Sequence, residues 1–261
     1  MTYNTILFSV DNNIAIITLN RPRSFNVLDT RALHELRDCF YEEIYGNDSV
    51  NAVIITGEGE KAFCGGADIK EMKDMEAAEA LALAQFGQRT MAIIEDCPKP
   101  VIAAINGVAL GGGFELALSC DFILAAKKAR FASPEVNVGI MVGWGASYKL
   151  VQILGKNRAK LLLFTGEMID SDTAFQLGLI NQIVPDEKLM DEALDLAGSL
   201  AEKPSVALTM VKRVVNRCGT LDRETAGLLE AEAFGACFST KDQKEGMNAF
   251  VEKRKPIFTG K

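Results

Sequence analysis

The chain has 261 residues, 48% of them hydrophobic and 24% charged, which is enough apolar material for one large domain, or for one domain with an appendage. The net charge of −7 argues against a general nucleic-acid-binding protein. No uninterrupted apolar run is long enough to span a bilayer, and no basic leader precedes Ile6. We therefore expect a soluble, cytoplasmic protein without a membrane partner.

The first hundred residues alternate between strand and helix patterns. The expected elements are, in order, two strands within residues 5–20, a helix capped by Asp29 and reaching about Tyr45, a strand at 52–56, a glycine-containing loop at 61–70 and a Met-bearing helical segment at 70–95.

The centre of the chain is a buried-strand pattern that leads through glycines into a helix pattern. The apolar run Val101–Ile105 is followed by Gly111-Gly112-Gly113 and then by the helix-forming residues 114–120. A helix that starts in this way has unpaired backbone N–H groups, which can hold an anion or a developing oxyanion. Glu115 lies in that first turn, beside these donors.

The rest of the chain changes from strands to helices. We expect strands at 122–126 and 179–184, a glycine loop at 139–146, helices on either side of Gly155, a short helix capped by Ser171 or Asp172, and helices at 187–202, 205–217, 221–238 and 240–253. This order indicates an α/β core, residues 1–200, and a helical region, residues 201–261.

A second acid, Glu135, follows the central helix 20 residues after Glu115. This spacing is too long for one helix face but fits a helix–strand–loop excursion that returns to the same place. Two carboxylates beside an oxyanion site can move protons to and from an acyl substrate. Taken singly, each glutamate is more often exposed or ion-paired than catalytic, so the hypothesis depends on the combination.

Several other kinds of site are disfavoured. The sequence has neither G-x-G-x-x-G nor a P-loop, so the nucleotide-binding folds that carry them are not expected. The only histidine, His34, lies in a helix pattern, which removes Ser-His-Asp catalysis and most histidine metal sites. The six cysteines form no C-x-x-C pair, and we expect free thiols. We predict no metal.

Five segments, spread in order over the whole chain, resemble the enoyl-CoA hydratase (crotonase) family. They are Ile17–Pro22, Phe63–Met72, Ala103–Ala117 apart from Val108, Pro134-Glu135 and Glu245–Arg254. Within the family, the chain looks most like the short-chain hydratases of 3-hydroxybutyryl-CoA dehydratase type. The resemblance implies a spiral of repeated ββα units with a C-terminal helical extension for oligomerisation and closure of the CoA site.

The resemblance also implies roles for individual positions. Glu115 and Glu135 match the catalytic glutamates, and Ala67 and Gly112 match the residues whose backbone N–H groups form the oxyanion hole. Ala67, Asp68 and Ile69 would border the CoA adenine, and Phe234 and Lys253 would meet the CoA nucleotide end, often from a neighbouring subunit. The implied assembly is a homotrimer, or a hexamer made of two trimers.

Three positions depart from the family pattern, and the first two of them lie next to Glu135, where they could reshape the acyl pocket. Val142 replaces a common proline, Ala132-Ser133 replaces Gly-Gln, and Ser24-Phe25 replaces Ala-Leu. We predict Met72, Val142 and Trp144 as acyl-pocket residues. Trp144 is open to two interpretations, as a packing residue or as a group that shortens or flattens the pocket.

The implied activity is the reversible syn hydration of a 2-enoyl-CoA to a 3-hydroxyacyl-CoA in fatty acid metabolism. Coenzyme A is part of the substrate, and no separate cofactor is expected. The alternatives are hydration of a conjugated or alicyclic dienoyl-CoA, double-bond isomerisation, which generally needs one principal carboxylate, and binding of CoA or RNA without turnover.

Overall fold

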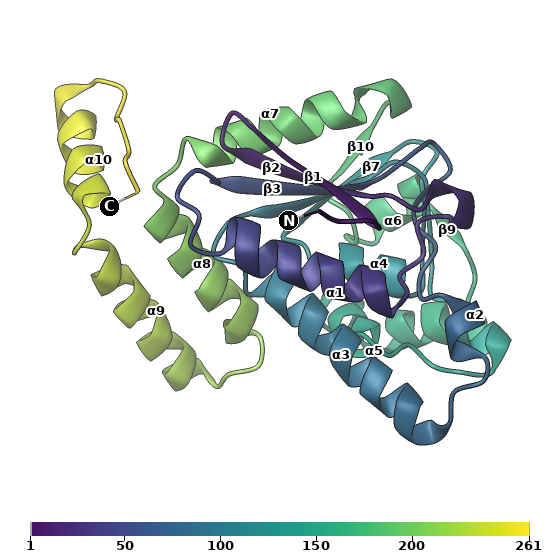
Figure 1. Cartoon of the computed structure of the whole chain (residues 1–261). Helices are drawn as coiled ribbons and strands as arrows, with labels where there is room; N and C mark the ends of the chain where they lie inside the picture. Colours follow the sequence, from purple (N-terminus) through teal and green to yellow (C-terminus); the bar gives the residue numbers. More distant parts are fainter. Residues whose placement is uncertain (1, 261) are drawn as a thin grey trace.

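The computed structural model describes residues 2–260, and its framework is a pair of sheets (Figure 1). The larger sheet has the order β1 (Ile6–Asp11), β2 (Ile14–Leu19), β3 (Ala52–Gly57), β5 (Val101–Ile105), β7 (Phe122–Ala126), β10 (Gln182–Val184). The smaller sheet has the order β4 (Ala62–Cys64), β6 (Val108–Leu110), β8 (Arg130–Ala132), β9 (Ile169–Asp170). The pairs β1–β2 and β8–β9 are antiparallel, and the other neighbouring strands are parallel.

The chain adds one strand to each sheet in every turn of a spiral, as β3 then β4, β5 then β6, and β7 then β8. Helices return the chain between turns, because parallel neighbours need a crossover connection. These helices are α2 (Ile69–Met72), α3 (Ala77–Glu95), α4 (Gly112–Ala117), α5 (Ala146–Thr165) and α6 (Ser171–Gln176). The predicted α/β spiral of ββα units is confirmed.

Both faces of the larger sheet are buried. On one face, Ile54, Ile102 and Leu124 pack in a core with α7 (Leu189–Ala201). On the other face, Val53 and Ile55 belong to a core shared with α1 (Thr30–Cys39) and α3. Figure 1 shows α7 on one side of the sheet and α1 and α3 on the other. Burial on both faces explains why the strands are continuous apolar runs.

Local signals account for several helix ends. Asp29 caps α1 as predicted, accepting a hydrogen bond from Ala32 N–H at 2.8 Å, and the helix continues as a π-helical turn at Phe40–Ile44. Gly155 is non-helical inside α5, where a break was expected. The predicted cap of α6, Ser171 or Asp172, is wrong, because Asp170 caps the helix by accepting a hydrogen bond from Thr173 N–H at 2.8 Å. Shorter 3₁₀ turns lie at Pro22–Ser24, Glu135–Val138 and Asp186–Lys188.

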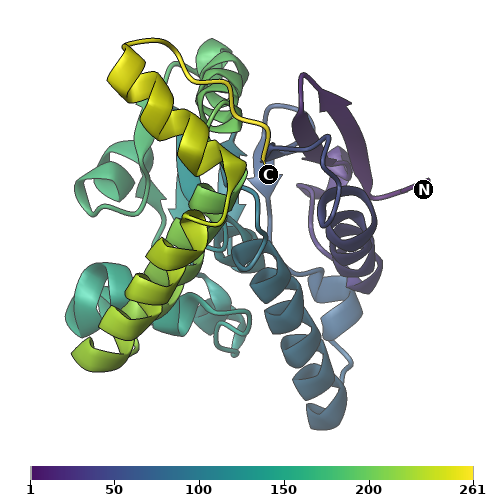
Figure 2. The ribbon, with the colours of Figure 1, turned by 90° about the vertical axis from the view of Figure 1, so that its left-hand side faces the viewer.

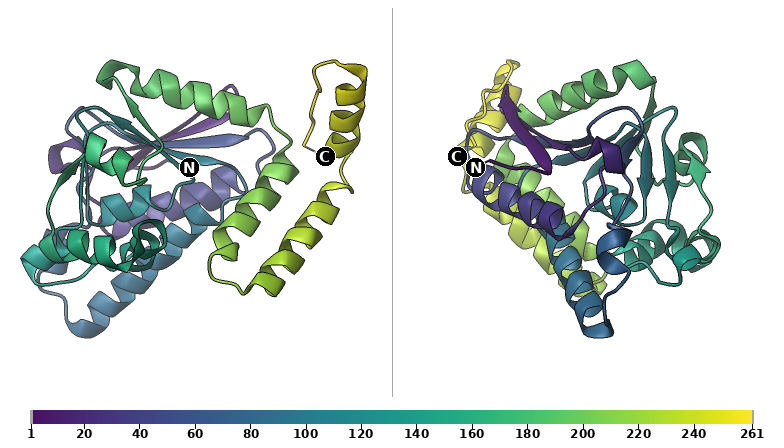
Figure 3. Two further views of the ribbon diagram at one scale, coloured as in Figure 1. Left: turned by 180° about the vertical axis from the view of Figure 1, so that it is seen from behind. Right: turned by 45° about the vertical axis from the view of Figure 1, so that its right-hand side comes forward.

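The C-terminal region is helical and consists of α8 (Ser205–Cys218), α9 (Arg223–Cys237) and α10 (Lys241–Glu252). An ion pair of 2.7 Å between Lys212 and Asp121 fastens α8 to the start of β7. Helices α9 and α10 stand to one side of the body in the left view of Figure 3 and lie in front of it in Figure 2, where that side faces the viewer. The division at residues 200 and 201 stays a prediction, and its outer ends, residues 1 and 261, lie outside the described residues.

None of the helices formed by residues 2–260 has both the length and the apolar character needed to cross a membrane. All six cysteines are free thiols.

Candidate active site

A cavity of about 700 Å³ is bordered by four separate segments of the chain. These are the loop that enters α2, one side of α3, the glycine turn that starts α4 and the loop between β8 and α5. Its lining includes the predicted site residues Ala67, Ile69, Met72, Gly112, Glu115, Glu135, Val142 and Trp144. The fold therefore brings together side chains from segments that are far apart in the sequence.

The turn from β6 into α4 can form only with small residues. Gly111 has φ +51°, a conformation that favours glycine, and its N–H donates to Ala132 O at 2.9 Å. A Cβ at Gly111 would lie 2.8 Å from Glu135 Oε1, and one at Gly112 would lie 2.3 Å from the Trp144 ring. The glycine run thus allows the backbone to approach both the second acid and the indole ring.

Two backbone N–H groups are available at this turn. The loop of Ala67 lies against it, because a Cβ at Gly66 would be 2.7 Å from Leu110 O and 3.3 Å from Gly112 N. Within residues 2–260, the N–H groups of Ala67 and Gly112 have no hydrogen-bond acceptor. Free donors at the wall of a cavity can stabilise an oxygen that gains negative charge.

Glu115 is held rigidly inside the protein. Its side chain comes from the first turn of α4, and the residue is only 2% exposed. Glu115 Oε1 accepts hydrogen bonds from the backbone N–H groups of Trp144 at 2.7 Å and Ala146 at 2.9 Å. Burial raises the pKa of Glu115, while these N–H donors act in the opposite direction by favouring the charged form.

Glu135 lies at the start of a 3₁₀ turn directly after Pro134. Burial raises its pKa to about 7, and the negative charge of Glu115 contributes to the rise. Within the described part of the chain, the buried Oε2 of Glu135 has no hydrogen-bond partner. The two carboxyls are therefore electrostatically coupled, and Glu135 can carry a proton near neutral pH.

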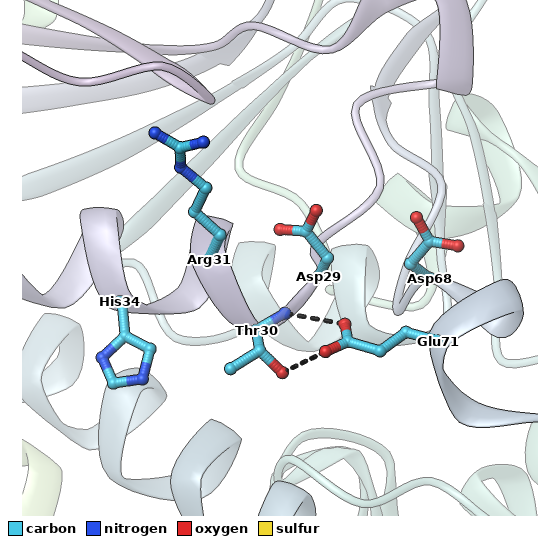
Figure 4. Close-up of a pocket in the computed structure, with 6 residues that line it drawn as sticks. All are labelled: Asp29, Thr30, Arg31, His34, Asp68 and Glu71. Atoms are coloured by element: carbon cyan, nitrogen blue, oxygen red, sulfur yellow. Dashed lines mark hydrogen bonds between the residues drawn. The ribbon is translucent and has the colours of Figure 1, made fainter. Parts of the chain in front are cut away.

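Asp68 is placed differently from its neighbours Ala67 and Ile69. Its carboxylate pairs with Arg21 at 3.2 Å and caps α2 by accepting from Lys70 N–H at 3.1 Å. Asp68 lines a second hollow, which Figure 4 shows with Asp29 and Glu71 beside it. There Glu71 accepts two hydrogen bonds from Thr30 and joins the start of α1 to α2.

Phe234 and Lys253 do not line the cavity of their own chain. Phe234 is 66% exposed on α9, and Lys253 is an exposed residue that ends α10 in a left-handed conformation. Their predicted contact with CoA stays a prediction.

Sequence reasoning missed Gln88, which lies on the wall formed by α3. Its Nε2 donates to Gly143 O at 2.9 Å and so supports the loop that holds Glu115. The helical pattern of residues 70–95 gives no sign of this role, because its partner is 55 residues away. Arg21 was noted only as part of a motif, yet it pairs with both Asp29 and Asp68.

Residues 9–261 match the family model described as enoyl-CoA hydratase/isomerase. The chain belongs to this family. It is 42% identical over 261 residues to a crotonyl-CoA hydratase from Syntrophomonas wolfei, with all of both chains covered. It is 43% identical over 255 residues to a short-chain-enoyl-CoA hydratase from Clostridium acetobutylicum, covering 98% of this chain and 97% of that protein.

Solved structures of family members have the same fold. An enoyl-CoA hydratase from Bacillus anthracis superposes with a TM-score of 0.94 at 36% identity, over 99% of this chain and 100% of the other. The resemblance to the family, inferred from short motifs, is confirmed, as is the predicted fold.

Proposed function

We propose that this chain is an enoyl-CoA hydratase that adds water reversibly across the C2=C3 bond of a short 2-enoyl-CoA. The observation that carries this proposal is the convergence of a buried carboxyl (Glu115), a half-buried one (Glu135) and two free backbone N–H groups on one cavity. Its family relatives include a crotonyl-CoA hydratase and a short-chain-enoyl-CoA hydratase, which supports a short acyl group.

The N–H groups of Ala67 and Gly112 would hold the thioester oxygen. Attack at C3 moves electrons from the C2=C3 bond toward that oxygen, so donors placed there stabilise the enolate-like transition state. Removing one donor of such a pair typically costs ~10²–10³-fold in rate. The oxyanion hole therefore makes C3 electrophilic enough to react with water.

The two glutamates would divide the proton transfers. Glu115 orients a water molecule and takes one of its protons while the water oxygen bonds to C3. Glu135, protonated at the start, delivers its proton to C2. A proton then passes from Glu115 back to Glu135, which restores both groups, and the net change is addition of one water.

We further propose that the chain works as a homotrimer or a hexamer of two trimers in the cytoplasm. Helices α9 and α10 carry the exposed apolar side chains Phe234, Phe250 and Val251, which supports an interface in that region. Phe234 and Lys253 would then reach the CoA nucleotide end in a neighbouring subunit. Sedimentation that shows only monomers would contradict the assembly, and equal weakening of CoA and 3′-dephospho-CoA esters by Lys253→Ala would contradict a phosphate contact.

The decisive assay follows the absorbance of the conjugated enoyl thioester with crotonyl-CoA. We expect loss of this absorbance together with formation of 3-hydroxybutyryl-CoA. Conversion of a 3-enoyl-CoA without any hydroxyacyl product would instead indicate an isomerase. Binding of CoA esters without either reaction would indicate a non-catalytic protein. A kcat/KM panel over linear, branched and cyclic dienoyl substrates would then define the acyl group.

A further inference from the structure

The side chain of Trp144 packs in a space that two glycines leave open. The residue is 4% exposed and belongs to the cavity lining. A Cβ at Gly87 of α3 would lie 2.1 Å from the indole Nε1, and a Cβ at Gly112 of α4 would lie 2.3 Å from Cζ3. The ring therefore bridges α3 and α4, with opposite edges resting where any larger residue would collide.

Gly87 has no evident reason to be a glycine apart from this contact. It lies inside α3, where a glycine weakens the helix relative to alanine. Its φ does not lie in the left-handed region that favours glycine, since it is absent from the positive-φ residues. The requirement is therefore steric, and it is imposed by the indole ring.

The backbone of Trp144 is fixed on both sides. The peptide group between Gly143 and Trp144 accepts a hydrogen bond from Gln88 Nε2 at its oxygen, at 2.9 Å. The same group donates through its N–H to Glu115 Oε1 at 2.7 Å. The ring consequently has a fixed base and cannot swing away without disturbing the support of Glu115.

We infer that the Trp144 ring is a rigid end wall of the acyl site, which admits short enoyl groups and excludes long ones. This inference rests on the proposed function. The Trp144 ring lies against Gly112, the residue proposed to hold the thioester oxygen, and the backbone N–H of Trp144 donates to Glu115 Oε1. The wall is therefore next to the reacting carbons, and a ring held between two helices cannot yield to a longer chain.

The first test compares acyl chain lengths in Trp144→Ala, which keeps the backbone N–H that Glu115 needs. We expect the ratio of kcat/KM for 2-decenoyl-CoA to that for crotonyl-CoA to rise at least about tenfold over wild type, because a pocket that loses a blocking group discriminates less. The matched control is Phe164→Ala, which removes an aromatic ring that is 72% exposed on α5 and outside the cavity lining. An unchanged ratio in Trp144→Ala would overturn the inference.

The second test needs no turnover, because Trp144 is the only tryptophan in the chain. Its fluorescence should change on titration with butyryl-CoA and not with CoA alone, since the acyl group meets the ring. Decanoyl-CoA should bind at least about tenfold more weakly to wild type than to Trp144→Ala, measured for both by displacement of a labelled CoA. If wild type binds butyryl-CoA and decanoyl-CoA equally well, the Trp144 ring does not limit the acyl length, whether or not the protein hydrates crotonyl-CoA. Failure of hydration with these binding differences intact would refute the proposed function alone.

A double-mutant cycle guards against simple misfolding. Gly87→Ala should lower the Tm in the wild-type background, because its Cβ collides with the ring, and should raise it in the Trp144→Ala background, because the collision is gone and the helix gains an alanine. If Trp144→Ala does not fold, Trp144→Phe takes its place in both assays, with a smaller shift in the same direction. Equal effects of Gly87→Ala on the Tm in both backgrounds would show that the Trp144 ring does not pack against Gly87.

Discussion

Replacing Glu115 by glutamine tests the proposed chemistry with little change in shape. In Glu115→Gln, the side-chain oxygen can still accept hydrogen bonds from the backbone N–H groups of Trp144 and Ala146. In the wild type these nitrogens lie 2.7 and 2.9 Å from Oε1. The amide cannot take a proton from water. The substitution therefore removes proton transfer while it keeps the packing and the backbone hydrogen bonds.

The expected magnitude follows from the role assigned to Glu115. A positioned general base contributes ~10²–10⁴-fold, which corresponds to roughly 3–5 kcal/mol in the activation barrier. The backbone N–H groups of Ala67 and Gly112, the proposed oxyanion donors, are untouched, and neither of them hydrogen-bonds to Glu115. We therefore expect kcat with crotonyl-CoA to fall by this factor, while the Kd for a saturated acyl-CoA changes less than about threefold.

Initial rates and isothermal titration with butyryl-CoA would measure both quantities. The matched control is Glu60→Gln, because Glu60 is exposed and lies outside the cavity lining. Near wild-type hydration by Glu115→Gln, with normal Tm, would refute the two-carboxylate mechanism. A large loss of binding with little change in kcat would show that Glu115 holds the substrate instead.

Other predictions concern the loop of Ala67, the second acid and a partly buried ion pair. Gly66 has φ +98° and no room for a Cβ beside Leu110 O. Gly66→Ala should therefore cost about 1–3 kcal/mol in stability and shift the Ala67 N–H enough to lower kcat by about 10²-fold. The control Gly198→Ala, in open space on α7, should lower neither Tm nor turnover. Folded Glu135 keeps its proton up to pH about 7, but the unfolded chain loses it near the ordinary value of 4.5, so stability falls as pH rises through this window. The Tm of wild type relative to Glu135→Gln should therefore be higher at pH 5 than at pH 8, and a constant difference would contradict the raised pKa. Lys149, whose side chain is 5% exposed, pairs with Glu95 at 2.6 Å. Lys149→Met should therefore lower the free energy of unfolding, measured in urea, by about 1–3 kcal/mol. The control Lys255→Met, at an exposed ion pair, should lower it by less than about 1 kcal/mol. Equal effects of the two lysine substitutions would contradict this ranking.

The fold could be predicted where a segment carries its own signal. The apolar run of β5 and the capped, amphipathic α1 are clear in the sequence because burial and capping act on neighbouring residues. The sequence does not reveal strands β4 and β6, since three residues cannot show alternation. Strand β4 lies in the segment expected to be a loop, and β6 lies in the stretch expected to lead through glycines into a helix.

The sequence indicated which residues to consider together, but it did not indicate their geometry. Glu115 and Glu135 were expected to meet, and the cavity brings them together. The bond from Trp144 N–H to Glu115 spans 29 positions, and the one from Gln88 to Gly143 spans 55, so no local pattern reveals either. The direction of the Asp68 carboxylate, toward Arg21, likewise depends on the packing of α2 against the loop after β2.

The surroundings of the two glutamates explain why their roles should differ. Burial raises the pKa of both glutamates, but Glu115 accepts hydrogen bonds from two backbone N–H groups, which favour its charged form. The Oε2 of Glu135 has no such donor in residues 2–260, and the charge of Glu115 disfavours a second charge nearby. These hydrogen bonds support the proposed division of roles, in which Glu115 is charged and Glu135 holds a proton near neutral pH. In the proposed mechanism, one carboxylate would then take a proton from water while its neighbour gives one to carbon, so that water can be added within a single cavity.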